Sequence, residues 1–365
     1  MVDQRIEKLA KLSVDYSVEV KPKDKVLIQG IDETYPLINE LYKRCLQKDA
    51  YPTIIANLDV QYTFFKNAKE HQLTFVSPFE KTLAETFDVA ISIHCEANPK
   101  RLSNIDPAKM RLRAAARKEL AEIFYRRVAE GKLRWTALPF PNNAAAQEAS
   151  MALQEYENFV YDSCLLNKPD PIAEWKKINK QQEGVSKFLN KASEFHIKGE
   201  DTDLAFNAKG RKWINSRGKE NMPDGEIFTA PIEKSANGTI RFTYPGLHLG
   251  REVEDIKLTF KDGKVTRASA AKSEDFLHQI LKVEGANRIG ELAIGTNYGI
   301  TRFTKNMLFD EKMGGTIHMA LGNAYPESGG VNKSSIHWDI LKDMKKDAKI
   351  LADGEPFYKN GKFLI

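Results

Sequence analysis

Residues 25–46 have the sequence KVLIQGIDETYPLINELYKRCL. The short apolar run KVLIQGID (25–32) predicts a buried strand, and the residues from about Tyr35 to Leu46 predict a helix. A second strand, YPTIIANLD (51–59), follows a few residues later. A strand, a helix and a strand in this order are typical of a parallel sheet whose strands are joined by crossover helices.

The same alternation continues to about residue 141. FDVAISIHCEAN (87–98) predicts a third strand, and RWTALPFP (134–141) predicts a fourth that its prolines end. Between them, a stretch rich in Ala and Arg predicts one long helix over about 107–130, with Asp106 as its N-cap and Pro107 in its first turn. We therefore expect an α/β N-terminal domain with a mostly parallel sheet.

A breaker sequence follows this region. Two helical stretches, at about 144–166 and 171–195, are separated by NKPDP at 167–171. Prolines and asparagine at this position favour a loop. We place the domain boundary here, with an α/β domain over 1–168 and a second domain over 169–365, although the helix at 144–166 fits either side.

Glycines, turns and short strands dominate the chain after about residue 200. Asn237-Gly238 and Asp262-Gly263 each lie between alternating residues, which predicts two β-hairpins. We expect this half to be an α+β, largely antiparallel domain.

The composition is that of an ordinary globular protein, with 42% hydrophobic and 29% charged residues. The net charge is only +5, and no basic run is interleaved with aromatic residues, which argues against a nucleic-acid partner. No signal peptide and no run of 18 apolar residues is present, so no membrane association is expected.

Cys45, Cys95 and Cys164 form no CxxC pair, which predicts reduced thiols in a cytoplasmic protein. His94 and Cys95 are adjacent on a strand and point to opposite faces, so they are not expected to act as base and nucleophile.

Four segments of the second half place an acid or a histidine in an apolar, strand-like setting. In SSIHWDIL, His337 and Asp339 are two residues apart, so on a strand they share one face. GGTIHMALGNAY gives His318 a similar setting, GELAIGTN places Glu291 beside apolar residues, and MPDGEIFTAP places Glu226 directly after a turn. Because buried acids are costly unless something neutralises them, we predict a pair of divalent cations at these residues.

Each of these residues alone also has a simpler interpretation. An HxD pair is common without a metal, His318 alone fits a hydrogen-bonded core histidine, and Glu291 alone fits an acid paired with Arg288. HExxH and CxxC arrays are both absent, so the pattern matches no standard zinc signature. The pattern predicts a metal site and does not name a substrate.

The same segments resemble the thermophilic metalloprotease family of dinuclear metalloaminopeptidases, which includes aminopeptidase T and aminopeptidase S. The similar strings occur in the family's order, and they are NMPDGEIFTAP (221–231), EGANRIGELAIGTN (284–297), LFDEKMGGTIHMALGNAY (308–325) and HWD (337–339). ADGEPFYKNGKFL (352–364) resembles the family's C-terminus. A weaker resemblance extends over the whole chain.

This resemblance implies a metal-dependent aminopeptidase that removes the N-terminal residue from peptides with a free N-terminus. It implies two divalent ions, of Zn, Co, Mn or Mg, that share a bridging water, and it implies a homodimer. The implied metal ligands are Glu226, Glu291, His318, His337 and Asp339. The active-site tyrosine, seven residues after the first histidine, corresponds to Tyr325, for which we expect a role in stabilising the oxyanion.

The chain departs from the family pattern beside the site. The loop between Tyr325 and His337 is shorter than in the longer members, and residues 340–342 replace a small, glycine-containing run. We expect these changes to affect substrate preference. No general base is singled out: Glu291 and Glu226 are the first candidates, and Glu311 and Glu284 are weaker ones.

Two other functions remain open. Another two-metal hydrolase, such as an esterase, amidase or phosphoesterase, would use the same ligands, but no phosphate-binding loop accompanies Arg288 and Arg302. A non-catalytic binding module would carry a structural metal or none, with a ligand at the strand ends of the N-terminal domain. Assays with peptide and phosphate-ester substrates, together with metal analysis, separate the three functions.

Overall fold

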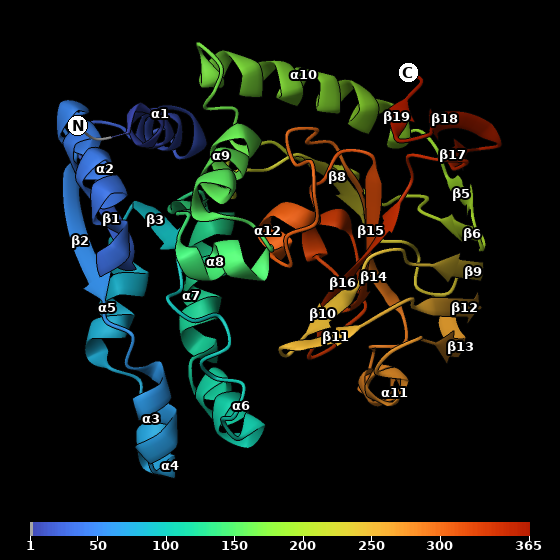
Figure 1. Ribbon diagram of the computed structural model, residues 1–365, viewed down its shortest axis with the longest axis horizontal. Helices are drawn as coiled ribbons and strands as arrows, with labels where there is room; N and C mark the ends of the chain where they lie inside the picture. Colours follow the sequence, from blue (N-terminus) through green and yellow to red (C-terminus); the bar gives the residue numbers. More distant parts are fainter. Residues whose placement is uncertain (1–2) are drawn as a thin grey trace. The chain divides into compact units, whose positions relative to one another are not determined.

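The computed structural model describes residues 3–365, which divide into two compact units. Unit 1 contains the chain up to residue 172 and residues 218–223, and unit 2 contains residues 173–217 and 224–365. In Figure 1 the blue and teal elements belong to unit 1, and the yellow, orange and red elements belong to unit 2.

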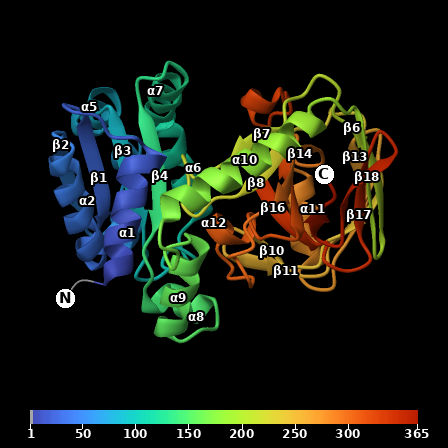
Figure 2. The same cartoon turned by 90° about the horizontal axis from the view of Figure 1, so that it is seen from above.

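Unit 1 is built on a four-stranded parallel sheet with the order β2-β1-β3-β4. Its strands are β1 (Lys25–Ile31), β2 (Tyr51–Asn57), β3 (Val89–His94) and β4 (Arg134–Pro139). Helices α1 and α2 pack together on one face of this sheet, and α5 and α7 pack together on the other (Figure 2). The predicted parallel α/β domain is therefore confirmed.

The helices of unit 1 differ from the prediction mainly in where they break. They are α1 (Gln4–Leu12), α2 (Tyr35–Gln47), α3 (Gln61–Asn67), α4 (Glu70–Leu73), α5 (Pro78–Thr86), α6 (Pro107–Ala116), α7 (Lys118–Ala129), α8 (Asn143–Glu148) and α9 (Leu153–Ser163). Asp106 caps α6 as predicted, because its carboxylate accepts from the Ala108 N–H at 2.8 Å. The predicted helix over 107–130 is interrupted at Arg117, whose backbone leaves the helical region (φ −89°, ψ 5°). Ser150, with φ +56°, likewise separates α8 from α9.

Helix α10 (Pro171–Leu189) is the longest in the described part of the chain. It ends before the predicted residue 195 because strand β5 begins at Glu194. Charged residues recur along its length, and none of the helices within residues 3–365 combines the length and apolar character needed to cross a membrane.

Unit 2 contains two large antiparallel sheets and a small hairpin. The first sheet has the order β16-β15-β14-β8-β7, formed by β7 (Ile214–Ser216), β8 (Glu226–Thr229), β14 (Ile289–Gly295), β15 (Thr316–Gly322) and β16 (His337–Asp343). The second has the order β13-β12-β9-β6-β5-β17-β18-β19, formed by β5 (Glu194–Gly199), β6 (Thr202–Asn207), β9 (Asn237–Arg241), β12 (Lys257–Lys261), β13 (Lys264–Ser269), β17 (Lys349–Ala352), β18 (Glu355–Lys359) and β19 (Lys362–Phe363). The hairpin is β10 (Gly246–His248) with β11 (Arg251–Val253), and the helices are α11 (Glu274–Leu281) and α12 (Met307–Asp310).

One apolar core joins the two large sheets. It includes Ile294, Met319 and Trp338 from the five-stranded sheet and Phe195 and Leu258 from the eight-stranded sheet. Each sheet therefore has one face in the core and one face available for polar side chains. This arrangement confirms the expected α+β, largely antiparallel second half.

One of the two predicted hairpins is wrong. Asp262-Gly263 connects β12 to β13 as predicted. Asn237-Gly238 instead forms the start of β9, which pairs with β6 and β12. Gly238 has φ +117°, and a Cβ atom there would lie 2.1 Å from the Asp203 carbonyl oxygen. The glycine therefore permits close approach of a neighbouring strand, which the sequence pattern does not distinguish from a turn.

Candidate metal centre

Four adjacent strands of the five-stranded sheet carry the predicted site residues on one face. Glu226 is the first residue of β8, Glu291 lies in β14, His318 lies in β15, and His337 and Asp339 lie in β16. These strands are neighbours in the sheet, so residues separated by more than a hundred positions in the chain meet. Strand alternation directs the intervening apolar residues into the core.

Small residues keep this face of the sheet open. In the register, His318 is opposite Ala293, Asp339 is opposite Ala320, Glu226 is opposite Gly295, and His337 is opposite Gly322. The start of β8 is also fixed by Gln182 of α10, which donates to the backbone carbonyls of Glu226 and Ser216 at 2.9 and 3.0 Å. Polar side chains therefore have room above a rigid floor.

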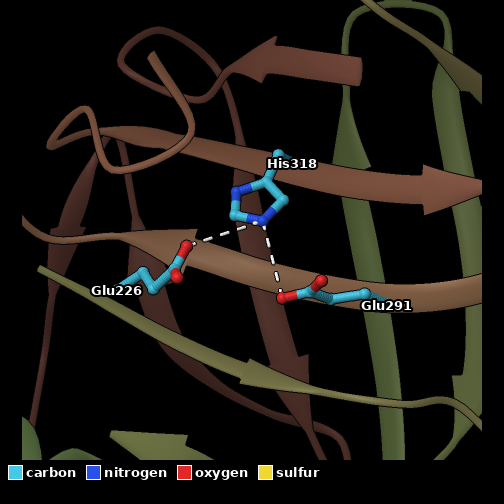
Figure 3. Close-up of side chains that lie close together, drawn as sticks. All are labelled: Glu226, Glu291 and His318. Carbon is cyan, nitrogen blue, oxygen red and sulfur yellow. Dashed lines mark ion pairs between the residues drawn. The ribbon is translucent and has the colours of Figure 1, made fainter. Parts of the chain in front are cut away.

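The side chains converge on the Nε2 atom of His318. This atom lies 3.6 Å from Glu226 Oε2 and 3.7 Å from Glu291 Oε1 (Figure 3), and 3.9 Å from Asp339 Oδ1. The Nε2 atom of His337 lies 3.1 Å from Glu291 Oε2 and 3.4 Å from Asp339 Oδ1. Glu291 therefore presents one carboxylate oxygen to each histidine.

Backbone carbonyls orient both imidazoles. The Nδ1 atom of His318 lies 2.8 Å from the Glu311 carbonyl oxygen, and that of His337 lies 2.8 Å from the Asn323 carbonyl oxygen. Because a carbonyl oxygen only accepts, each Nδ1 donates, and each Nε2 faces the carboxylates. Metal-binding histidines are typically held in this way.

Burial and close charges shift the pKa values of the cluster. Burial alone would lower the pKa of both imidazoles, but the adjacent carboxylates raise it to about 10 for His318 and about 11 for His337. Burial raises the pKa of Glu226. It would also raise those of Glu291 and Asp339, but the imidazoles lower them. In the metal-free protein, protons on the imidazoles therefore partly neutralise the acids.

The donor set fits divalent cations. Two buried oxygens, Glu226 Oε2 and Asp339 Oδ1, have no hydrogen-bond partner, and orphaned buried acceptors are costly unless a cation or proton compensates them. The side chains form two groups, and within each group the ligand atoms all lie within 4.8 Å of one another. One group is Glu226, Glu291 and His318, and the other is Glu291, His337 and Asp339. Imidazole with carboxylate suits Zn²⁺, Co²⁺ and Mn²⁺.

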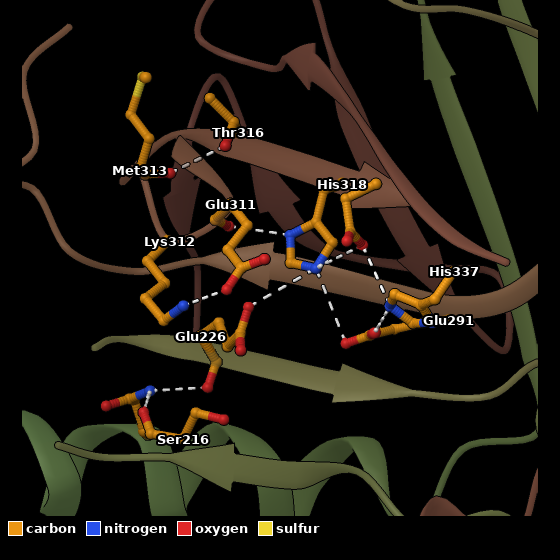
Figure 4. A network of polar contacts seen from close by, with 11 residues as sticks. Ser216, Glu226, Glu291, Glu311, Lys312, Met313, Thr316, His318 and His337 are labelled. Atoms are coloured by element: carbon orange, nitrogen blue, oxygen red, sulfur yellow. Dashed lines mark hydrogen bonds and ion pairs between the residues drawn. The ribbon is translucent and has the colours of Figure 1, made fainter. Parts of the chain in front are cut away.

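Glu311, which the sequence analysis named only as a weaker candidate for the general base, and Lys312, which it did not name, join this cluster. Glu311 forms a third such group with His318 and Asp339, and the ammonium group of Lys312, a fully buried residue, is ion-paired with Glu311 (Figure 4). The available signal was the run Asp310-Glu311-Lys312 between apolar neighbours, because three adjacent charges in such a setting need partners.

Tyr325 lies at the rim of the cluster. Its ring centroid is 4.9 Å from that of His337 and 5.7 Å from that of Phe228, and the residue is 40% exposed. Burial of the phenol and the nearby carboxylates raise its pKa, so at neutral pH the hydroxyl keeps its proton and can donate.

Glu284, the other weak candidate for a base, is exposed, and Arg288 donates to the Glu233 carbonyl.

Known proteins are similar to this chain over nearly its full length. The family described as thermophilic metalloprotease (M29) matches residues 2–363. Aminopeptidase 2 of Geobacillus stearothermophilus is 27% identical, over 98% of this chain and 97% of its own length. Aminopeptidase PepS of Streptococcus thermophilus is 27% identical, over 99% and 98%. The structure of wild-type AmpT from Thermus thermophilus superposes with a TM-score of 0.87 at 23% identity, covering 99% of each chain, so the fold is shared throughout.

Proposed function

The chain belongs to the thermophilic metalloprotease (M29) family and is a metalloaminopeptidase, and we propose that its buried cluster binds two divalent cations. The proposed ligands are Glu226, Glu291, His318, His337 and Asp339. The observation that carries this proposal is that all five side chains meet with both imidazole Nε2 atoms turned toward the carboxylates.

Glu291 divides the ligands into two halves. Its Oε1 atom faces His318, which also faces Glu226, and its Oε2 atom faces His337, which also faces Asp339. A carboxylate with one oxygen toward each half is suited to bridge two ions. Glu226 and His318 would hold one ion, and His337 and Asp339 would hold the other.

The bound ions would supply Lewis acidity, which lowers the pKa of a water molecule and polarises the carbonyl group of the scissile peptide bond. Glu311 is placed to handle the proton. Its side chain is 21% exposed, the most of the carboxylates in the cluster, and it is ion-paired with Lys312. We assign Glu311 the role of accepting a proton from the attacking water and passing it to the amine that leaves when the C–N bond breaks.

Tyr325 is assigned to the oxygen of the scissile carbonyl. Negative charge develops on this oxygen when water attacks, and a protonated phenol at the rim of the cluster donates a hydrogen bond to it. The carboxylates of the cluster provide the negative charge that attracts the α-ammonium group of a peptide. This attraction would restrict cleavage to the N-terminal residue.

Enzyme assays with and without metal test the proposal. We expect the purified protein to release N-terminal residues from short peptides or aminoacyl anilides, to lose this activity with a chelator, and to regain it with Zn²⁺, Co²⁺ or Mn²⁺. Full activity after complete removal of metal would contradict the metal mechanism. Hydrolysis of phosphate esters without peptidase activity would support the phosphoesterase alternative instead.

The oligomeric state is proposed from the family resemblance, and the cellular compartment is proposed from the cysteines. We propose a homodimer in the cytoplasm, where the thiols of Cys45, Cys95 and Cys164, which form no disulfide, stay reduced. Light scattering is expected to give twice the 41.3 kDa of one chain. A mass of 41.3 kDa at micromolar concentration would contradict the dimer.

A further inference from the structure

Tyr325 lies in the loop between β15 and β16, whose one short helical turn is a 3₁₀ helix at Pro326–Ser328. The tyrosine ring packs against His337 and Phe228, with centroids 4.9 and 5.7 Å away. Neither ring contact is a hydrogen bond to the phenol hydroxyl, so the backbone of the loop decides where this hydroxyl lies. A role for Tyr325 in catalysis therefore depends on what fixes the loop.

Two other loops of unit 2 hold the loop between β15 and β16. The Ser328 hydroxyl donates to the Tyr325 carbonyl oxygen at 2.7 Å, and the Lys212 N–H donates to the Ser328 carbonyl oxygen at 3.0 Å. Further along, the Val331 N–H donates to Glu233 Oε1 at 3.0 Å. Lys212 lies between β6 and β7, and Glu233 lies between β8 and β9. The loop that carries Tyr325 is therefore attached at two points.

An ion pair between Arg211 and Glu233 connects the two attachments. Arg211 directly precedes Lys212, and its Nη2 atom lies 2.6 Å from Glu233 Oε2. The two side chains are 11% and 20% exposed, so their attraction is screened less by water than that of a surface pair. The Arg288 guanidinium donates to the backbone carbonyl of Glu233 and fixes its other end. Glu233 therefore presents one carboxylate oxygen to Arg211 and the other to the loop.

We propose that the Arg211–Glu233 ion pair positions Tyr325 by fixing the loop between β15 and β16. This inference rests on the proposed function, in which the Tyr325 hydroxyl donates to the oxygen of the scissile carbonyl. Arg211 and Glu233 are positioning residues, because the contacts above join them to each other and to the loop. A displacement of about 1 Å can cost a catalytic group about 10²-fold in rate. A loosened loop should therefore slow the reaction without releasing metal.

A double-mutant cycle between Arg211 and Tyr325 tests the inference in the full-length protein loaded with Zn²⁺. For Arg211→Met we expect kcat for an aminoacyl anilide to fall about tenfold, with KM and bound Zn²⁺ within about twofold of the unmodified protein. In the Tyr325→Phe background, Arg211→Met should lower kcat by less than about twofold, because the hydroxyl that it positions is already absent. Arg211→Lys keeps a positive charge opposite Glu233 and should retain kcat within about threefold.

Hydrogen exchange of the loop amides gives a readout that does not depend on metal. In the metal-depleted protein, residues 327–332 should exchange at least about tenfold faster in Arg211→Met than in the unmodified protein. Methionine keeps part of the aliphatic stem that lies beside Gly329, so the main loss is the charge. Arg241→Met is the matched control, because Arg241 on β9 pairs with Asp255 at 2.6 Å. This control should change neither the loop exchange nor kcat by more than about twofold.

Two results would overturn the inference. One is unchanged kcat or unchanged loop exchange in Arg211→Met, which would show that the ion pair does not hold the loop. The other is a loss of kcat by the same factor with Tyr325 and with phenylalanine at this position, which would show that Arg211 acts independently of the hydroxyl.

Glu233→Gln takes the place of Arg211→Met in both experiments if the latter does not fold. Glutamine keeps an acceptor for the Val331 N–H and removes the charge opposite Arg211. An unmodified protein that binds no Zn²⁺ would contradict the proposed function itself, and the exchange experiment would still test whether the ion pair fixes the loop.

Discussion

Two regions of the molecule contain acids beside a histidine or a cysteine. One is formed by the loops that follow the parallel strands of unit 1, and the other is the polar face of the five-stranded sheet in unit 2. In unit 1, the Asn142 amide donates to Glu33 at 3.0 Å, and the Cys95 thiol donates to the same carboxylate oxygen at 3.8 Å. Burial raises the pKa of Cys95 to about 12, so the thiol stays protonated. The acceptor in this group, Glu33 Oε2, therefore has two donors, and Glu33 is exposed to solvent.

In unit 2, by contrast, the acceptors outnumber the donors. Glu226 Oε2 and Asp339 Oδ1 are buried without hydrogen-bond partners, and the imidazoles need extra protons to offset the acids. The comparison indicates that an excess of buried hydrogen-bond acceptors identifies a cation-binding site better than the presence of acids and histidines does.

The largest loss of metal and activity is expected from substitution of Glu291, which faces both histidines. Glu291→Gln keeps the volume of the side chain and removes its charge, so both ions should be lost and kcat/KM should fall by about 10³-fold or more. Metal analysis and a peptidase assay on the same sample measure the two effects. A variant that retains two ions and activity would remove Glu291 from the bridging position.

Tyr325→Phe is expected to have a smaller effect on catalysis and none on metal content. Loss of one donor to a developing oxyanion typically lowers kcat by about 10²–10³-fold. The ring contacts with His337 and Phe228 are retained by phenylalanine, so Zn²⁺ stoichiometry serves as the control. A rate within twofold of the unmodified enzyme would assign Tyr325 a packing role only.

Metal affinity is expected to increase with pH. The pKa values of His318 and His337 in the metal-free protein are about 10 and about 11, so at pH 7 both carry a proton that a cation must displace. At pH values below these pKa values, the apparent metal affinity rises about tenfold per pH unit for each proton that the metal displaces. Calorimetric titration in buffers of different ionisation enthalpy measures the protons released. Binding that releases none would contradict the assigned ligands.

The smallest effect is expected in unit 1. Cys95→Ser replaces a protonated thiol with a hydroxyl that can make the same contact with Glu33, so metal content and peptidase activity should stay within about twofold of the unmodified protein. The same metal analysis and assay apply. A loss of bound metal would mean that the group around Glu33 in unit 1 also takes part in cation binding.

Much of this architecture is predictable from local sequence. Short apolar runs identify the four parallel strands of unit 1, and the two-residue spacing of His337 and Asp339 places them on one face of a strand. The order of strands in the five-stranded sheet is not local, so local sequence alone does not bring Glu226 to His318, and the expectation that they meet depended on the family resemblance. Lys312 was missed for a related reason: a lysine in a charged run normally predicts a solvated surface, and only the folded chain buries it against Glu311.

Backbone conformation accounts for the remaining differences. Arg117 and Ser150 interrupt helices whose sequences carry no proline or glycine at those points. Gly238 is required by the approach of a strand more than thirty residues earlier in the chain, which a turn signal cannot reveal.

The central claim is that the acids and imidazoles of the five-stranded sheet hold two cations. Anomalous diffraction from crystals grown with Zn²⁺ tests it most directly. We expect two peaks per chain, one beside Glu226 and His318 and one beside His337 and Asp339, with Glu291 contacting both. Zinc found only at other residues, or no zinc at this face of the sheet, would contradict the claim.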